Sequence, residues 1–192
     1  MKDISFHKSV IVTLAFPLIF TACFGANDNI KYHFDEEQLD FIAYDEGQSL
    51  SLIDTIGVRY VLNQNEYKRD FRKVIGYWGV EGHYEYYQVD FSPSDNHKPR
   101  LTVELYTEDS HLWIEFWGYT VYAPVKHNTG NDPQFKDIYQ SINIDGKIYE
   151  DVYKLIAYKD DHMNESATLF WNKEHGVIQL LLSNGKTVTR DE

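Results

Sequence analysis

The feature that most constrains the fold is a repeated pattern of short apolar and aromatic runs separated by tight-turn signals. The tetrapeptides "IDGK" (144–147) and "SNGK" (183–186) contain Asp-Gly and Asn-Gly, the pairs favoured in two-residue β-hairpin turns. The runs between turn signals are rich in β-branched and aromatic residues, as strands are. The expected strands are 48–53, 57–63, 83–91, 101–106, 111–122, 148–158, 168–171 and 177–182.

These strands predict an all-β fold. Turn signals that recur about every 8–12 residues are typical of sandwiches and barrels. We therefore expect an antiparallel meander that forms a sandwich or an open half-barrel, with at most one or two short helices. One short helix is expected within Asp35–Phe41. The segment 133–142 fits either a helix capped by Asp132 or a strand, because its apolar residues satisfy both periods.

Composition limits the partners and the sources of stability. No repeat or linker divides residues 32–192, so a single β domain is expected there. The net charge of −12 argues against a nucleic-acid partner, whose phosphates require a basic face, and disfavours adsorption to anionic lipid headgroups. The chain contains one cysteine, Cys23, so no disulfide can form within it. Stability must come from an apolar core.

The N-terminus has the pattern of a secretory signal peptide. Lys2 and Lys8 form a basic start, and residues 9–22 follow without a charge. This uncharged stretch of 14 residues is shorter than the roughly 20 residues that a membrane-spanning helix needs. Residues 1–22 are therefore interpreted as a signal peptide.

The end of this segment, Phe20-Thr21-Ala22-Cys23, resembles the lipobox of bacterial lipoproteins. In that family the cysteine sulfur carries a diacylglycerol, the chain is cut before the cysteine, and the new amino group is acylated. The resemblance implies lipidation of Cys23, a lipidated tether over 23–31, and a location in the cell envelope, anchored to the membrane through the N-terminal lipid. Phe24 is not the Asp that retains some lipoproteins in the inner membrane, so the outer membrane is expected.

Three stretches, 44–62, 143–155 and 169–190, resemble uncharacterised lipoproteins of Bacteroidota in their order of strands and turns. No activity is attached to that family, so the resemblance implies no catalytic residue. It implies one modification, since "DTI" (54–56) matches the pattern of Asp, Ser or Thr, and an apolar residue at which these lipoproteins are O-glycosylated. Thr55 is the expected glycosylation site.

No complete catalytic or metal-binding motif is present. "SDN" (94–96) and "SNGK" (183–186) match fragments of the penicillin-binding set in the wrong order. The oxygen-rich loop 159–166 lacks the spacing of an EF-hand calcium site. Carboxylates that could face a glycosidase cleft lie in expected strands, at Glu85, Asp90, Glu104 and Glu115. No catalytic residue, metal ligand or cofactor is predicted, and an enzyme is not favoured.

Aromatic residues make up 16% of the chain and are the most informative candidates for binding. If 111–122 is one strand, Trp113, Trp117 and Tyr119 share the face opposite Leu112 and Ile114. That face either packs into the core or a second layer, or it forms a platform for a glycan or a lipid.

The leading functional hypothesis is a non-catalytic envelope lipoprotein that binds or scaffolds a glycan, a lipid or an envelope protein. One alternative is a lipid or lipoprotein carrier with an open β half-barrel. The other is an envelope hydrolase.

Overall fold

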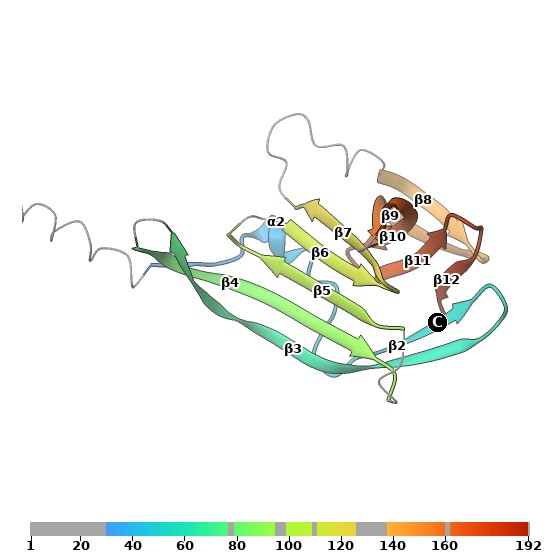
Figure 1. Ribbon diagram of the computed structural model, residues 1–192, viewed down its shortest axis with the longest axis horizontal. Coiled ribbons are helices and arrows are strands. Elements are labelled where there is room, and N and C mark those ends of the chain that lie inside the picture. Colours follow the sequence, from blue (N-terminus) through green and yellow to red (C-terminus); the bar gives the residue numbers. More distant parts are fainter. Residues whose placement is uncertain are drawn as a thin grey trace, which may run out of the picture.

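The computed structural model describes residues 30–76, 79–94, 99–108, 111–125, 138–159 and 162–191. They form twelve strands and one short helix (Figure 1). The first six strands are β1 (Lys31–Tyr32), β2 (Ser49–Asp54), β3 (Arg59–Gly76), β4 (Gly79–Ser92), β5 (Leu101–Tyr106) and β6 (His111–Phe116). The remaining elements are β7 (Tyr119–Pro124), β8 (Ile138–Ile144), β9 (Lys147–Lys159), β10 (His162–Asn172), β11 (Gly176–Leu182), β12 (Thr187–Arg190) and the helix α2 (Glu36–Leu39).

Ten strands close into an antiparallel barrel in the order β4-β3-β2-β12-β11-β10-β9-β7-β6-β5. The barrel closes because β5 pairs with β4. The paired positions run from Phe91 opposite Leu101 to Tyr86 opposite Tyr106. Among these ten strands, closure gives each strand a paired neighbour on both sides. The prediction of an all-β fold with few helices is confirmed. The open half-barrel is wrong, because β4 pairs with β3 on one side and with β5 on the other.

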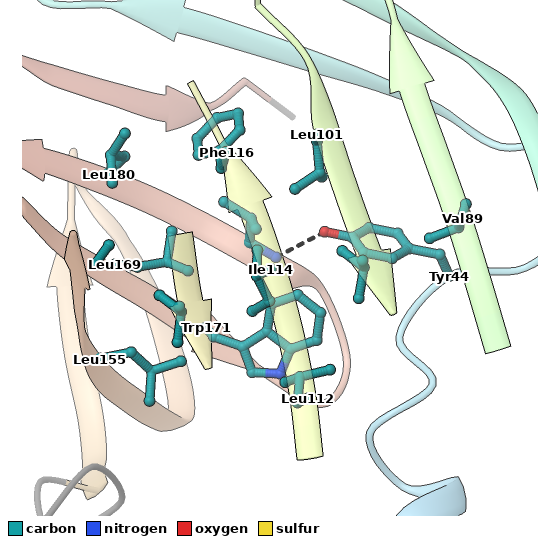
Figure 2. Close-up of a cluster of buried hydrophobic side chains, with 14 of the residues drawn as sticks. Tyr44, Val89, Leu101, Leu112, Ile114, Phe116, Leu155, Leu169, Trp171 and Leu180 are labelled. Carbon is teal, nitrogen blue, oxygen red and sulfur yellow. Dashed lines mark hydrogen bonds between the residues drawn. The ribbon is translucent and has the colours of Figure 1, made fainter. Parts of the chain in front are cut away.

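Large apolar side chains fill the interior of the barrel (Figure 2). Alternation along β6 points Leu112, Ile114 and Phe116 inward, and all three are buried. They lie close to Leu169 and Trp171 of β10 (Figure 2). Burial of each such side chain is worth about 1.5–3 kcal/mol, so this core supplies the stability that disulfides cannot.

The predicted short helix is confirmed as the single turn α2. Its N-cap, Asp35, accepts a hydrogen bond from the Gln38 backbone N–H at 2.9 Å, and the Gln38 side chain accepts one from the Asp35 N–H at 3.0 Å. This reciprocal pair is a capping box, which satisfies two N–H groups that the helix end leaves free. The capping signal depends only on residues close in sequence, which explains why the helix could be predicted without knowledge of the fold.

The ribbon formed by β3 and β4 projects past the barrel, on the left of Figure 1. The expected strands 57–63 and 83–91 cover only parts of β3 and β4, which have 18 and 14 residues. The missed part of β3 lacks an apolar face, because charged residues such as Arg69 and Arg72 point to both sides of the ribbon. A ribbon outside the core needs no apolar alternation, so the usual strand signal is absent.

The expected single strand 111–122 is wrong. It is the hairpin of β6 and β7, which reverses at Trp117 and Gly118. Both residues have positive φ, 60° and 78°, as a type I′ turn requires. Tryptophan is not a usual residue at this position, so the sequence contained only Gly118 as a turn signal.

The hairpin of β8 and β9 lies partly outside the barrel, because β8 pairs only with β9. Of the ambiguous segment 133–142, residues 138–142 are strand and 133–137 lie outside the described residues. The predicted Asp145-Gly146 turn is confirmed, with φ of 54° and 88°. A small second core covers the outer face here and consists of Ile144, Tyr149, Val152, Phe170 and Ile178.

Candidate functional site

Three turns meet at one end of the barrel and enclose a pocket of about 240 Å³. They are the β2–β3 turn, the β11–β12 turn and the β6–β7 turn, and this end lies on the right of Figure 1. The pocket is lined by Asp54, Thr55, Ile56, Trp117, Leu182, Asn184, Lys186, Thr187 and Val188. Its lining therefore combines apolar and polar side chains.

Trp117 forms the aromatic wall of the pocket. Its ring packs edge-on against Tyr60, with centroids 5.2 Å apart and planes at 85°. Its backbone N–H donates to the carbonyl of Arg100 at 3.2 Å, which fixes the turn. A bulky residue in the left-handed region costs roughly 1–3 kcal/mol and is found where the surrounding structure or a function demands it. The strained residue of this turn thus lines the pocket.

Asp54 holds the β2–β3 turn at the rim. Its carboxylate accepts hydrogen bonds from the backbone N–H groups of Ile56 and Val58, at 3.0 and 2.9 Å, and from the Tyr60 hydroxyl at 3.1 Å. Desolvation raises the pKa of Asp54, but the hydrogen bonds from Val58, Tyr60 and Ile56 outweigh it and lower the pKa below its ordinary value. The side chain is therefore a charged structural acceptor at neutral pH.

Thr55, the predicted glycosylation site, lies exposed in the same turn. Its hydroxyl lies 3.2 Å from the carbonyl oxygen of Thr187, to which it donates, and it also accepts from the Thr187 backbone N–H. The hydroxyl thus links the β2–β3 turn to β12. Glycosylation of Thr55 stays a prediction, and a glycan there would stand at the rim of the pocket.

A wider, more polar groove of about 560 Å³ continues from the pocket. It shares Asp54, Thr55 and Thr187 with the pocket and reaches the β8–β9 turn, where the Lys147 ammonium lies 4.9 Å from the centroid of the Tyr149 ring. Its other lining residues are Ile53, Gly57, Ile144, Asp145, Thr189, Arg190 and Asp191. The two hollows together suit a ligand with an apolar face and a polar edge.

The expected platform of Trp113, Trp117 and Tyr119 does not form. Trp113 lies on the outer face of β6, opposite Tyr122 of β7. Tyr119 follows the turn and is buried, with its hydroxyl donating to Glu165 at 3.1 Å. Because the chain reverses at Trp117, the three side chains cannot share one strand face, and only Trp117 lines the pocket.

Three of the four carboxylates considered for hydrolysis, Glu85, Asp90 and Glu104, have structural partners, and Glu104 accepts from the Tyr106 hydroxyl at 2.6 Å. Glu85 accepts from Arg69 at 2.7 Å and Asp90 from Arg100 at 3.1 Å. In the oxygen-rich loop, Glu165 pairs with Lys159 at 2.8 Å, and 160–161 lie outside the described residues.

Within the described ranges, no group of three or more His, Cys, Asp or Glu side chains could hold a metal ion. Across the same part of the chain, no helix has the length and apolarity needed to cross a membrane. Cys23 precedes the first described residue.

Sequence reasoning missed Tyr60 and Lys186 as site residues. Tyr60 lies in an expected strand, and nothing in the sequence distinguishes it from the other tyrosines of the chain. Lys186 follows a hairpin turn, where a lysine is ordinary.

Comparison of the chain with protein-family models, with curated proteins and with solved structures finds no match. The site is therefore interpreted from its own geometry.

Proposed function

We propose that this protein is a lipid-anchored envelope lipoprotein whose barrel is a non-catalytic binding module for a saccharide, held in the pocket beside Trp117. The observation that carries the binding proposal is the strained, partly exposed Trp117 in the lining of a pocket that also has polar side chains. The lipid anchor is supported by the lipobox resemblance at Cys23.

The chemistry of the pocket favours a sugar ring over a purely apolar ligand. An aromatic ring offers a flat apolar surface to the C–H face of a sugar, and Ile56 and Val188 extend that surface. Asn184, Lys186 and Thr187 also line the pocket, and their amide, ammonium and hydroxyl groups are of the kinds that hydrogen-bond to sugar hydroxyls. The pocket volume of about 240 Å³ is below the roughly 300–1,000 Å³ typical of sites for drug-sized ligands, and the groove of about 560 Å³ continues from it. A short saccharide with one ring in the pocket is therefore the expected occupant.

A lipid carrier, the alternative from the sequence, needs an apolar interior open to an acyl chain. The described interior is filled by fully buried side chains, among them Leu112, Ile114 and Leu155. Nothing in the described part of the chain favours a carrier or a hydrolase, so the binding module is preferred.

The test replaces Trp117 with asparagine. Asn-Gly is a preferred type I′ pair, so Trp117→Asn keeps the hairpin while it removes the aromatic wall. Relief of the strained residue and loss of the ring's packing against Tyr60 oppose one another, so we expect a folded variant, checked by circular dichroism, that has lost saccharide binding. Binding is measured on an immobilised panel of bacterial, plant and host glycans with the full-length protein in detergent.

The control is Trp113→Asn, which changes an aromatic residue on the outer face and should leave glycan binding intact. Equal glycan binding by Trp117→Asn and the wild type would refute the assignment of the pocket. A wild-type protein that retains no glycan from the panel would refute the saccharide class.

A further inference from the structure

The chain enters the described structure at the projecting ribbon, at the end of the molecule opposite the pocket (Figure 1). The carbonyl of Ile30 accepts a hydrogen bond from the His83 N–H at 2.8 Å. The next residues, Lys31 and Tyr32, pair in parallel with His83 and Tyr84 of β4. The first described residues therefore lie along the ribbon.

This exit point is held firmly against β4. The Tyr32 ring stacks on Tyr84, with centroids 4.4 Å apart. It also covers Gly82, where an added Cβ would lie only 2.7 Å from the ring. On the other side, the Lys31 ammonium lies 4.8 Å from the centroid of the Phe71 ring. The start of the fold thus has a fixed position relative to the ribbon.

The same end exposes apolar side chains to solvent. Ile75, near the end of β3, is 71% exposed, and Ile30 and Tyr32 are each 39% exposed. On the same ribbon, Arg69 pairs with the buried Glu85. A second arginine, Arg72, pairs with Glu108 at 2.5 Å. The exposed apolar side chains of this end would contact a bilayer through apolar burial. Lys31 and Lys73, which the register places on either side of His83, add positive charge beside them.

The length of chain before the fold decides which end can reach a membrane. Six residues lie between Cys23, the predicted anchor, and Ile30, so the two positions are seven chain steps apart and separated by at most about 25 Å. Strand β3 runs 18 residues from the pocket end to the ribbon tip, roughly 60 Å. With the chain anchored at Cys23, the tether is long enough for the ribbon end to contact the bilayer. The ribbon end lies closer to the anchor than the pocket does.

We propose that the ribbon end, formed by β1 and the adjoining described parts of β3 and β4, rests on the lipid bilayer with the Ile75 side chain in the interfacial layer, and that the Trp117 pocket faces away from the membrane. The inference rests on the proposed anchor at Cys23. The occupant of this apolar surface is a lipid bilayer, because the tether confines the surface to its vicinity.

The test uses cysteine probes on the full-length lipoprotein. Lipidation consumes the only natural thiol of the chain, so an added cysteine is uniquely reactive. Ile75→Cys places the probe on the ribbon, and Ile56→Cys is the matched control, since Ile56 is an isoleucine 80% exposed at the pocket end. Each variant is labelled with an environment-sensitive fluorophore and reconstituted in vesicles of phosphatidylethanolamine and phosphatidylglycerol.

We expect the probe at 75 to emit at shorter wavelength, to be quenched by a spin-labelled lipid and to be shielded from aqueous iodide. The probe at 56 should show the reverse. Unchanged results in vesicles of phosphatidylcholine alone would support apolar contact. A vesicle-bound protein with both probes in water, or with the lipid contact at 56, overturns the inference while the anchor stands. Protein that does not float with the vesicles overturns the anchor and, with it, the inference.

Discussion

Tyr44 joins the segment after α2 to the barrel through both its hydroxyl and its backbone. The hydroxyl accepts a hydrogen bond from the Val177 N–H at 2.8 Å (dashed line in Figure 2), and its carbonyl accepts one from the Tyr87 hydroxyl at 3.0 Å. Burial raises the pKa of the Tyr44 phenol well above its ordinary value, so the group stays neutral. One residue thus ties three parts of the chain together.

Tyr44→Phe should therefore destabilise the fold although it preserves the ring. The substitution leaves the buried Val177 N–H without this acceptor, at a cost of about 1–3 kcal/mol. Urea unfolding followed by tyrosine and tryptophan fluorescence measures the change. Tyr158→Phe is the control, because Tyr158 is exposed and the loss of its hydroxyl should have little effect. Equal unfolding midpoints for the two variants would contradict this role of Tyr44.

At the scale of elements, Glu85 of β4 attaches the N-terminal segment to the ribbon. Its carboxylate accepts from the Phe34 N–H at 2.9 Å and from Arg69 at 2.7 Å. Burial raises the pKa of Glu85, but these two hydrogen bonds and the charge of Arg69 outweigh it, and the pKa is lowered overall. The ionised form is therefore the one that the fold stabilises.

This shift predicts a pH dependence. Because the folded pKa lies below the unfolded value of about 4.3, the contribution of Glu85 is complete above that value and is lost as the pH falls through the folded pKa. Glu85→Gln should lower the melting temperature near neutral pH and flatten its decrease on acidification to about pH 3, measured by circular dichroism. Glu46→Gln, in the exposed turn before β2, is the control. An equal acid decrease in wild type and Glu85→Gln would contradict the prediction.

At the scale of the whole molecule, the two ends of the barrel have different tasks in our proposals. The ribbon end receives the tether and the other end holds the pocket, so a ligand could bind without steric conflict with the bilayer. This division depends on lipidation of Cys23, which precedes the described structure.

Cys23→Ala should therefore abolish fatty-acid labelling and release the protein from the membrane fraction. Two or more acyl chains are needed for a long-lived anchor, so loss of the attachment residue removes the membrane affinity. Metabolic labelling with an alkyne fatty acid and membrane fractionation measure both effects. Phe20→Leu, which restores the common lipobox residue, should retain the label. Labelling that persists in Cys23→Ala would disprove the anchor.

Local signals in the sequence were sufficient for the fold class and for several turns. Asp145-Gly146 reverses the chain as expected because these residues adopt positive φ at low cost, and this depends on no distant contact. The capping box of Asp35 and Gln38 is equally local. Of the candidate site, Thr55 and Trp117 were both singled out, but for unrelated reasons and without any indication that they are neighbours.

Only the tertiary structure decided what lies next to what. Barrel closure depends on the pairing of β4 with β5, and strand alternation says which side faces inward but not which strand is the neighbour. The turn at Trp117 is stabilised by contacts with Arg100 and Tyr60, which are both distant in sequence. The local sequence was therefore not sufficient to predict this turn. That turn separates Trp117 from Trp113 and Tyr119 and carries it to the pocket of Thr55. The sequence by itself determined which side chains of a strand such as β6 face inward and which face outward, because side-chain alternation is a property of each strand alone. The site, in contrast, exists only through contacts between strands far apart in the chain.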